Sequence, residues 1–439
     1  MIKGYFDRFF IPLYLAGSTG LFAVLFVPID SGIVEQGSTP LFILTWSVFY
    51  SLTFMALLWH KVFFTRSDLF VLLIPLYFLA SSLWSLQPEK TFAYSSALLC
   101  NALFAIYLCH RVHTEHLPYI IMWLIIGLCF LGLLANLAGL DATYYYDTHH
   151  RATIIGTTPI RGFFYHKISA GFFSGLAAVL SLALLKSYQR FIVFFLLVLF
   201  NLLTGSIAGF VLLTSSLVLY VTIKLALHLQ VSRFWFLIAI FVFFVLVVIF
   251  FNSVGGYFLS LLHRDPTLTG RTLLWELGLK ASQEKAFLGW GYFGYNGTKI
   301  AQMAALAFPE FNNYIAPHFH NSYIQYLVEA GWIFGGLFIG LYFYVLAGWY
   351  KISLSTRSTA DIGFVCGLFY IIVSGFIIHT LFRYNDLSLI IFLYALKALE
   401  SQRYKKNHPS LNKPKKKAHL QFPQQRTETA QLQRRKPKT

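Results

Sequence analysis

Long apolar runs, separated by short polar turns, make up most of the chain between Phe9 and Leu399. Most runs have about 18 to 25 residues, the length that a helix needs to cross a hydrocarbon layer ~30 Å thick. A helix satisfies its own backbone hydrogen bonds where water is absent, so the runs are expected to be helical. About twelve membrane-spanning helices are predicted, at residues 9–29, 41–59, 69–86, 92–109, 118–140, 168–186, 191–203, 206–227, 234–251, 331–350, 362–380 and 385–399.

Two of the predicted spans differ from the others in their boundaries. The seventh and eighth predicted spans are separated only by Thr204-Gly205-Ser206, and the seventh is short. The first span follows Lys3 and Arg8 and is longer than the apolar core of a signal peptide. No small-residue cleavage site follows it, so we expect it to be retained as a span.

The positions of Lys and Arg indicate the orientation of the spans, because short cytoplasmic loops carry the excess of positive charge. The short loops on one side (30–40, 87–91, 204–206 and 381–384) contain only Lys90 and Arg383. An even number of spans with both termini cytoplasmic fits this pattern. The charges that alternate onto the other side are Lys3, Arg8, Lys61, Arg66, Arg111, Lys186, Arg190, Lys224, Arg233, Lys351 and Arg357.

Two longer segments then fall on the extracytoplasmic side, at residues of about 141–167 and 252–330. Both are polar, aromatic and rich in His and Arg, and long ordered loops are where function concentrates. We find neither a fixed-period repeat nor the inverted pair of broken helices that is typical of transporters. The predicted fold is therefore all-α, a polytopic membrane protein with a large extracytoplasmic loop.

Composition supports this prediction. The chain is 57% hydrophobic and 12% charged, whereas a soluble domain carries about 25% charged residues. Four cysteines (Cys100, Cys109, Cys129 and Cys366) lie within or at the ends of apolar runs and are expected to be packing residues.

The formal net charge of +17 is concentrated near the C-terminus. Residues 397–439 contain 13 Lys and Arg and two acidic residues, Glu400 and Glu428, which gives this segment a net charge of +11 and leaves +6 for the rest of the chain. We predict an integral membrane domain at 1–400 and a disordered basic cytoplasmic tail at 401–439. In a membrane protein such a tail is expected to contact anionic membrane lipids rather than nucleic acid.

The first outer segment ends in Arg161-Gly162-Phe163-Phe164-Tyr165-His166-Lys167, directly before the sixth span. Interfacial snorkelling could place Arg161 and Lys167 there, but external positive charge opposes the orientation rule, and Arg151 adds to it. A helix beginning at Ile168 would offer further donors to an anion, so we predict anion binding. Asp147-Thr148-His149-His150 lacks a further ligand at suitable spacing, so a polar surface is favoured there over a metal site.

The second outer segment contains Thr269-Gly270-Arg271, Gly289-Trp290-Gly291 and His320-Asn321. Residues 323–329 have the pattern of an amphipathic helix along the membrane surface, and Gly331 opens the tenth span. His320 therefore lies at a helix start near the interface, with Glu329 nine residues further on. A lone interfacial histidine is usually only a satisfied polar group, yet an imidazole is also the natural general base for a sugar hydroxyl.

The stretch from His320-Asn321 to Gly331 resembles the His-Asn-x9-Gly motif of the bacterial O-antigen ligase family. That family also includes O-antigen and exopolysaccharide polymerases and some protein O-oligosaccharyltransferases. Further resemblances are Gly270-Arg271 with Trp275 and Gly289-Trp290-Gly291, the basic stretch 161–167 with Gly171, and the Thr204-Gly205-Ser206 break. Two departures are Ile207, where the family usually has Arg, and Phe334, where it commonly has Gly, which here comes one residue later as Gly335.

The resemblance implies a GT-C-like glycosyltransferase of the bacterial inner (plasma) membrane with a periplasmic active site. It implies an undecaprenyl-diphosphate-linked glycan as donor, and a lipid A core sugar or a second lipid-linked glycan as acceptor. The implied catalytic residues are His320 and Arg271, and the implied diphosphate-binding residues are Arg161, Lys167, Arg271 and Arg383. The implied supporting residues are Asn321, Glu329, Gly331 and Trp290.

In this interpretation His320 deprotonates the acceptor hydroxyl and the cations stabilise the departing diphosphate, with inversion at the anomeric carbon. No Asp-x-Asp occurs in the chain, so the reaction is predicted to need no metal and no other cofactor. Ligation to lipid A core is favoured slightly over polymerisation of lipid-linked repeats.

Two other classes of function compete. A lipid-linked oligosaccharide flippase or other transporter needs ionisable residues along a path through the membrane, but nearly all charges in this chain gather at span ends. A purely structural membrane component gives no reason for outward-facing Arg and His. Both are disfavoured.

Overall fold

The structure, a computed structural model, describes residues 2–26, 39–146, 153, 156–250, 271–306 and 318–407. All regular structure in these ranges is helical, and the pairing of Tyr144 with Ile160 is an isolated bridge rather than a strand. The predicted all-α fold is confirmed.

The predicted apolar runs correspond to helices. Seven helical segments in the described ranges are long and apolar enough to cross a membrane, and shorter apolar helices accompany them at 188–204, 233–242 and 359–374. The chain is thus a multi-pass membrane protein, and the count of twelve spans stays a prediction. The helices of these runs are α1 (Ile2–Gly17), α2 (Leu21–Phe26), α3 (Pro40–Trp59), α4 (Arg66–Ala80), α5 (Pro88–Arg111), α6 (Leu117–Leu137), α7 (Lys167–Leu184), α8 (Ser187–Thr204), α9 (Ile207–His228), α10 (Arg233–Phe250), α14 (Ser322–Thr356), α15 (Thr359–Ser374) and α16 (Leu387–Asn407).

The predicted first span differs from the structure. It is divided into α1 and α2 by a turn in which Gly20 has a φ of +99°, a conformation that L side chains rarely adopt. At Gly17 a Cβ atom would lie 2.3 Å from the Phe22 ring, so the absence of a side chain lets the chain fold back on itself. The carbonyl of Ser18 in this turn accepts a hydrogen bond from the Leu387 N–H at 2.9 Å, which ties the turn to the start of α16.

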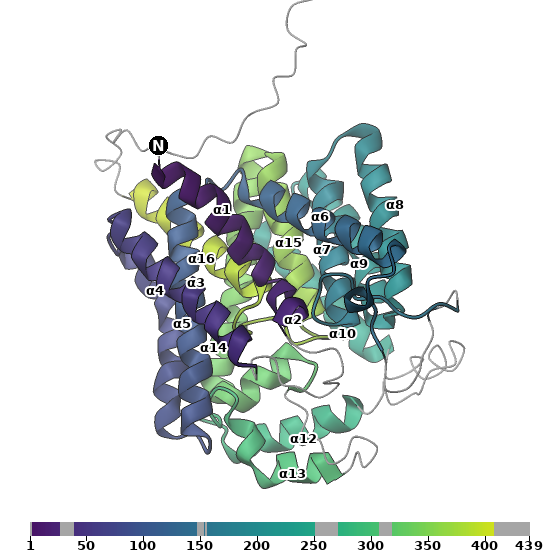
Figure 1. Ribbon diagram of the computed structural model, residues 1–439. Coiled ribbons are helices and arrows are strands. Elements are labelled where there is room, and N and C mark those ends of the chain that lie inside the picture. The colour runs from purple at the N-terminus through teal and green to yellow at the C-terminus, as the bar shows by residue number, and fades with distance from the viewer. Residues whose placement is uncertain are drawn as a thin grey trace, which may run out of the picture.

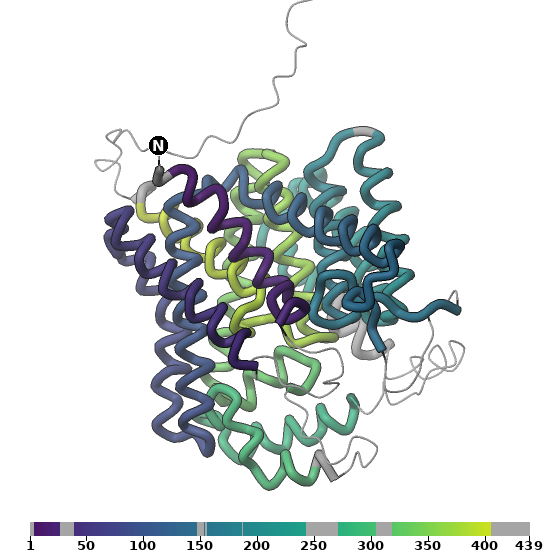
Figure 2. The backbone as a smooth tube through the Cα atoms, in the orientation of Figure 1, coloured from purple at the N-terminus to yellow at the C-terminus, as the bar shows by residue number. Residues whose placement is uncertain are grey.

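The helices of the second outer segment gather at one end of the bundle. Figure 1 shows α12 (Arg271–Glu284) and α13 (Lys299–Leu306) at the end opposite the N-terminus of the chain, and the backbone trace in Figure 2 follows the same arrangement. The short 3-10 helix η4 (Gly294–Gly297) lies between them in sequence.

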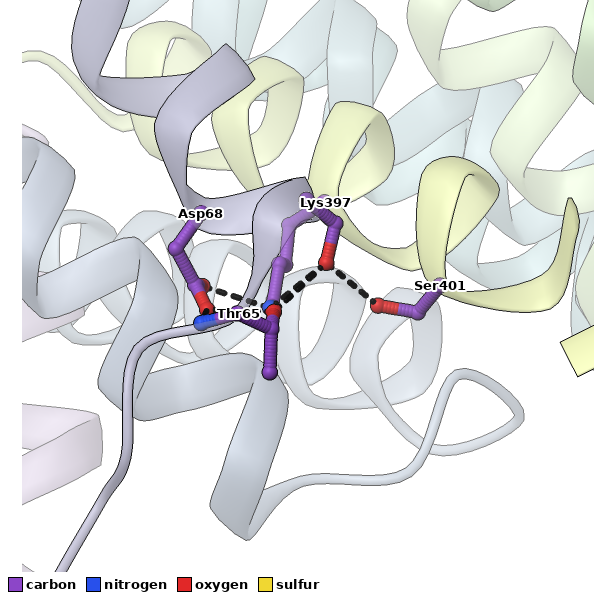
Figure 3. Close-up of polar contacts among 5 residues, drawn as sticks. Thr65, Asp68, Lys397 and Ser401 are labelled. Atoms are coloured by element: carbon purple, nitrogen blue, oxygen red, sulfur yellow. Dashed lines mark hydrogen bonds and ion pairs between the residues drawn. The ribbon is translucent and has the colours of Figure 1, made fainter. Parts of the chain in front are cut away.

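The other end of the bundle carries two buried charge clusters. In one, the Asp7 carboxylate accepts hydrogen bonds from Arg111 and from the Tyr107 hydroxyl. In the other, Lys397 of α16 lies 2.5 Å from a carboxylate oxygen of Asp68 and 2.8 Å from the Thr65 hydroxyl (Figure 3). Because each buried charge has a partner, its desolvation is compensated, and the clusters fix α1 to α5 and α4 to α16.

The predicted basic tail lies mostly beyond the described part of the chain. Helix α16 continues to Asn407, and residues 408–439 are outside the described ranges. The division into domains at 1–400 and 401–439 stays a prediction.

Candidate functional site

His320 stands directly before the N-cap of α14. The Asn321 carboxamide oxygen accepts the N–H groups of Tyr323 and Ile324 at 3.0 and 3.2 Å, which satisfies the first turn of the helix. His320 itself has a φ of +52°, which is unusual for a residue with a side chain. Its N–H donates to Nδ1 of His318 at 3.2 Å. The sequence therefore fixes a strained turn that carries a half-buried imidazole.

A chain of hydrogen bonds leads from Glu329 to this turn. The Glu329 carboxylate is fully buried, and its Oε1 accepts from Gln325 Nε2 at 2.8 Å and from the Phe293 N–H at 2.9 Å. The Gln325 Oε1 in turn accepts the Phe319 N–H at 3.1 Å. The Phe319 carbonyl accepts from the Trp275 indole at 2.9 Å, so the residue before His320 is held on both sides.

The Gly289-Trp290-Gly291 segment packs against the end of the first part of α14, residues 322–330. The N–H groups of Trp290 and Gly291 donate to the carbonyls of Val328 and Glu329 at 2.9 and 3.0 Å. The Trp290 indole donates to the Ala281 carbonyl of α12 at 2.8 Å. Trp290 is thereby placed as a scaffold residue that joins α12 to α14.

Gly331 marks a kink within α14. Residues 322–330, which precede it, are buried on nearly all sides, so they do not form the amphipathic surface helix that the sequence predicted. Its φ and ψ of +75° and 177° are not helical, although the helix continues on both sides of it. A Cβ atom here would lie 2.4 Å from the Phe287 carbonyl oxygen, and one at Gly289 would lie 2.4 Å from the Glu329 carbonyl. Both glycines are therefore required for two backbones to touch.

Gly289→Ala is accordingly expected to destabilise the outer end of the protein, because the added methyl group meets backbone and φ is +67°. We expect a clear fall in the melting temperature of the purified protein, corresponding to several kcal/mol. Gly336→Ala is the matched control, since no atom of the described part of the chain lies within 4 Å of its Cβ position. Equal melting temperatures for the two variants would contradict this packing.

The departure from the family pattern after Gly331 has a structural counterpart. At Gly335 a Cβ atom would lie 2.8 Å from the Tyr326 carbonyl oxygen, so this later glycine provides the close approach. Phe334 stacks on the Tyr77 ring at 4.5 Å. The Tyr77 hydroxyl hydrogen-bonds the Leu288 and Ala330 carbonyls, each at 3.0 Å, and so braces the kink.

The loop before α16 is longer than predicted. The sequence placed a span at 362–380 and a short loop at 381–384, but α15 ends at Ser374 and residues 375–386 are not in a regular helix. The Ser322 N–H donates to the Gly375 carbonyl at 2.7 Å, and the Ser322 hydroxyl accepts the Thr380 N–H at 3.1 Å. These bonds dock the loop onto the residues that follow His320.

Arg271 strengthens the same contact. Its Nη1 donates to the Ile377 carbonyl at 2.9 Å, from the first residue of α12. The preceding residues of the predicted motif, Thr269 and Gly270, lie outside the described residues.

Three imidazoles meet where this loop touches the His320 turn. The His318 ring lies 4.3 Å from the His320 ring and 5.4 Å from the His379 ring, centroid to centroid. Burial lowers the pKa of His320 well below its usual value, and His318, Arg271, His166 and Arg383 lower it further. His320 is therefore neutral near pH 7 and able to accept a proton.

Arg161 lies in the first outer segment and is held by its own neighbourhood. It is 8% exposed, and its Nε and Nη1 donate to the carbonyls of Ala142 and Tyr165, each at 3.1 Å. Its Nη2 has no hydrogen-bond partner among the described residues. Burial lowers the pKa of Arg161. A buried guanidinium nitrogen that still has its N–H groups to donate is suited to an anionic oxygen.

The Thr204-Gly205-Ser206 break supports the Arg161 segment. Gly205 ends α8 in the left-handed conformation, with a φ of +61°. Near it, the Leu203 carbonyl accepts the Ile160 N–H at 3.0 Å. The end of α8 before the break thus holds the backbone of Ile160, the residue before Arg161.

Lys167 is the first residue of α7, with its amine 5.1 Å from the centre of the Tyr145 ring. His166 is the N-cap: its Nδ1 accepts the Ile168 N–H at 3.0 Å, and its Nε2 is 2.6 Å from the Tyr145 hydroxyl. The predicted helix start at Ile168 is thus correct to within one residue.

Arg383 connects the first outer segment with the loop before α16. A narrow cavity is formed by Ser18, Thr19, Gly20, Tyr165, Ser169, Phe173, Arg383, Asn385 and Asp386. Burial raises the pKa of Tyr165, while the positive charges of Arg383 and Arg161 oppose that rise, so both guanidinium groups act on one phenol. Arg161, Arg271, Arg383 and His320 thus come from separate segments to one end of the bundle.

The sequence did not single out His318, His379, His166 or Tyr165. The spacing His318-Phe319-His320 was a usable signal, but His379 lay inside a predicted span. Among the described residues no group of three or more His, Cys, Asp or Glu side chains could hold a metal ion. The Asp147–His150 cluster and Arg151 are outside the described residues.

Two comparisons with known proteins bear on this arrangement. Residues 192–339 match the family described as O-antigen ligase. A segment of 74 residues is 39% identical to the exopolysaccharide production protein ExoQ of Rhizobium meliloti (strain 1021), covering 16% of this chain and 16% of that protein. The family match includes Arg271 and His320, whereas Arg161, Lys167 and Arg383 lie outside it. The resemblance to the O-antigen ligase/polymerase family is confirmed.

Proposed function

Because residues 192–339 carry the sequence of the O-antigen ligase family, we propose that this protein transfers a glycan from undecaprenyl diphosphate to a sugar hydroxyl. The observation that supports this most strongly is the position of His320, which lies with His318 against the loop before α16 that Arg271 holds and that carries Arg383. A base for a hydroxyl and cations for a diphosphate are the two requirements of such a transfer.

In the proposed reaction His320 takes the proton of the acceptor hydroxyl. The hydroxyl oxygen attacks the anomeric carbon as the bond from that carbon to the diphosphate oxygen breaks, and the bonding electrons leave with the diphosphate. Attack opposite the leaving group inverts the anomeric centre. Asn321 and Glu329 act as positioning residues, because they hold the turn on which His320 stands.

The diphosphate would lie against Arg161, Arg271 and Arg383, with Lys167 at the edge of the group. Two adjacent phosphates carry roughly two negative charges, and unpaired charge is costly near a membrane. The Nη2 of Arg161, which has no hydrogen-bond partner in the described ranges, supports this role. The cations would stabilise charge that grows on the leaving diphosphate, so we propose that the reaction needs no metal.

The pH dependence follows from the lowered pKa of His320. A general base acts in its neutral form, and a lowered pKa keeps that form dominant at and above the usual imidazole pKa of ~6.5. The rate at saturating donor is therefore expected to be constant between about pH 6.5 and 7 and to fall at lower pH. Above pH 7 the rate is expected to change again, because burial raises the pKa of Glu329, which positions the His320 turn, to about 8. A half-maximal rate at pH 6.5 or above on the acid side of the profile, in a buffered initial-rate series, would argue against this assignment.

The acceptor distinguishes ligase from polymerase. Ligation to a lipid A core sugar remains our first proposal, while the similarity to an exopolysaccharide production protein favours a second lipid-linked repeat as the alternative. The test uses purified protein in liposomes with a lipid-diphosphate glycan and each acceptor in turn. Product on lipid A core supports a ligase, and lengthened lipid-linked glycan supports a polymerase. Movement of intact donor across the bilayer without transfer would favour a flippase and overturn the proposal.

The proposed orientation places this site on the periplasmic side of the bacterial inner membrane, with both termini in the cytoplasm. Lys285 next to the site and Lys61 at the opposite end are both exposed. In a background without native cysteines, Lys285→Cys should react with an impermeant maleimide from outside, and Lys61→Cys should not. The reverse labelling pattern would place the site on the cytoplasmic side, where it would not meet the proposed substrate.

A further inference from the structure

His379 carries a buried imidazole next to the His320 turn. It is 2% exposed, and neither ring nitrogen has a hydrogen-bond partner among the described residues. Buried polar groups are nearly always hydrogen-bonded, and an unsatisfied one is costly. His379 lies on the docked loop before α16, 5.4 Å from His318, ring to ring. Such a residue beside the proposed base indicates a ligand that completes its hydrogen bonding.

An aromatic cluster adjoins His379. The Phe293 ring centre is 6.3 Å from that of His379, 4.9 Å from that of Tyr94 and 5.7 Å from that of Tyr384. Tyr94 and Tyr384 stack at 4.8 Å with an interplanar angle of 13°. The three aromatic rings are half-buried and come from α5, the segment after Gly291 and the loop before α16. Together they present an apolar surface next to an unsatisfied imidazole.

The position of Phe293 is fixed by the site itself. Its φ is +55°, a strained value for a residue with a side chain, and its N–H donates to the Glu329 carboxylate at 2.9 Å. Glu329 also holds Gln325, which supports the turn at His320. The Glu329 side chain is therefore hydrogen-bonded both to Phe293 of the aromatic cluster and, through Gln325, to the turn that carries His320.

We propose that His379 and the rings of Tyr94, Phe293 and Tyr384 form a binding subsite for a pyranose ring. This inference rests on the proposed function. A neutral imidazole has one N–H donor and one acceptor nitrogen on different sides of the ring. This matches two hydroxyls of a sugar, one that accepts from the N–H and one that donates to the other nitrogen. An ionised phosphate only accepts, so it leaves the acceptor nitrogen without a partner. The apolar C–H face of a pyranose would cover the aromatic rings.

The electrostatic surroundings agree with this assignment. Burial lowers the pKa of His379 well below its usual value, and Arg383 and His320 lower it further. The imidazole is thus neutral near pH 7 and offers a donor and an acceptor at once. The sugar could belong to the donor, next to its diphosphate, or to the acceptor, next to its reacting hydroxyl.

The experiment uses the full chain in lipid nanodiscs and compares native protein with His379→Phe and His379→Asn. Phenylalanine removes both polar atoms, whereas asparagine keeps a donor and an acceptor. The probes are undecaprenyl diphosphate, undecaprenyl diphosphate carrying one hexose, and the methyl glycoside of that hexose. His113→Phe, an exposed histidine at the opposite end of the bundle, is the matched control.

If the subsite binds the donor sugar, His379→Phe should lower the affinity for the hexose-bearing lipid about tenfold and leave the affinity for undecaprenyl diphosphate unchanged. The affinity of His379→Asn for the hexose-bearing lipid should lie between those of native protein and His379→Phe. If the subsite binds the acceptor sugar, the affinity for the methyl glycoside should fall instead. Tyr94→Leu should act in the same direction as His379→Phe and serves if that variant does not fold. The subsite proposal would be overturned if all affinities were unchanged, or if the affinity for bare undecaprenyl diphosphate fell as much as that for the sugar-bearing probes. Failure of native protein to bind undecaprenyl diphosphate would instead refute the proposed function.

Discussion

Replacing His320 with alanine is expected to lower the rate of glycan transfer by about 10²- to 10⁴-fold, the usual contribution of a general base. In the structure the His320 backbone N–H bonds to His318, and Asn321 caps the helix that follows. Neither interaction needs the imidazole of His320. The variant should therefore fold, insert and bind undecaprenyl diphosphate as native protein does.

The measurement is the initial rate with a lipid-diphosphate glycan at saturating acceptor, together with the affinity for undecaprenyl diphosphate. His113→Ala serves as the control, because His113 is an exposed imidazole at the other end of the bundle. Retention of most of the transfer rate by His320→Ala would exclude it as the base. Loss of rate together with loss of lipid binding would show a structural defect instead.

Arg271→Lys is expected to lower the affinity for undecaprenyl diphosphate by about tenfold to a hundredfold, the size of a lost charge-assisted hydrogen bond. The guanidinium of Arg271 already donates one N–H to the Ile377 carbonyl at 2.9 Å. Its planar fork leaves further donors in fixed directions for a phosphate oxygen. The compact ammonium of lysine cannot hold the carbonyl and grip the phosphate in the same geometry.

The control for Arg271→Lys is Lys280→Met on the same helix. Lys280 is exposed and pairs with Glu276 four residues earlier, an interaction worth little at a surface. Lipid binding should be unchanged in this variant. Equal binding by native protein and Arg271→Lys would show that the charge alone suffices, or that Arg271 only holds the loop.

The sequence predicted the helices well because apolar length is a direct consequence of the membrane. The break at Thr204-Gly205-Ser206 was also visible, and so was the helix start near Ile168. The glycines at 289 and 331 were noticed as motif residues, but their reason is tertiary: two backbones touch there, and a Cβ atom would prevent it.

The parts that the sequence could not predict are those where apolar residues leave regular structure. Phe376, Ile377 and Ile378 extend an apolar run, so residues 375–380 were read as the end of a span. In the structure their carbonyls bind Asn321, Arg271 and Ser322, and the run becomes a docked loop. This error hid His379. The turn at 18–20 was missed for the same reason, since a few polar residues do not end an apolar run.

The central claim is that cations from separate outer segments hold a lipid-borne diphosphate beside His320. A cryo-EM structure of the full chain in nanodiscs with undecaprenyl diphosphate tests it most directly. We predict density for the diphosphate within hydrogen-bonding distance of Arg161 Nη2 and of Arg271 or Arg383, with the outer phosphate facing His320. Density for the diphosphate at the end of the bundle that carries Asp7 and Lys397, or away from these arginines, would contradict the account.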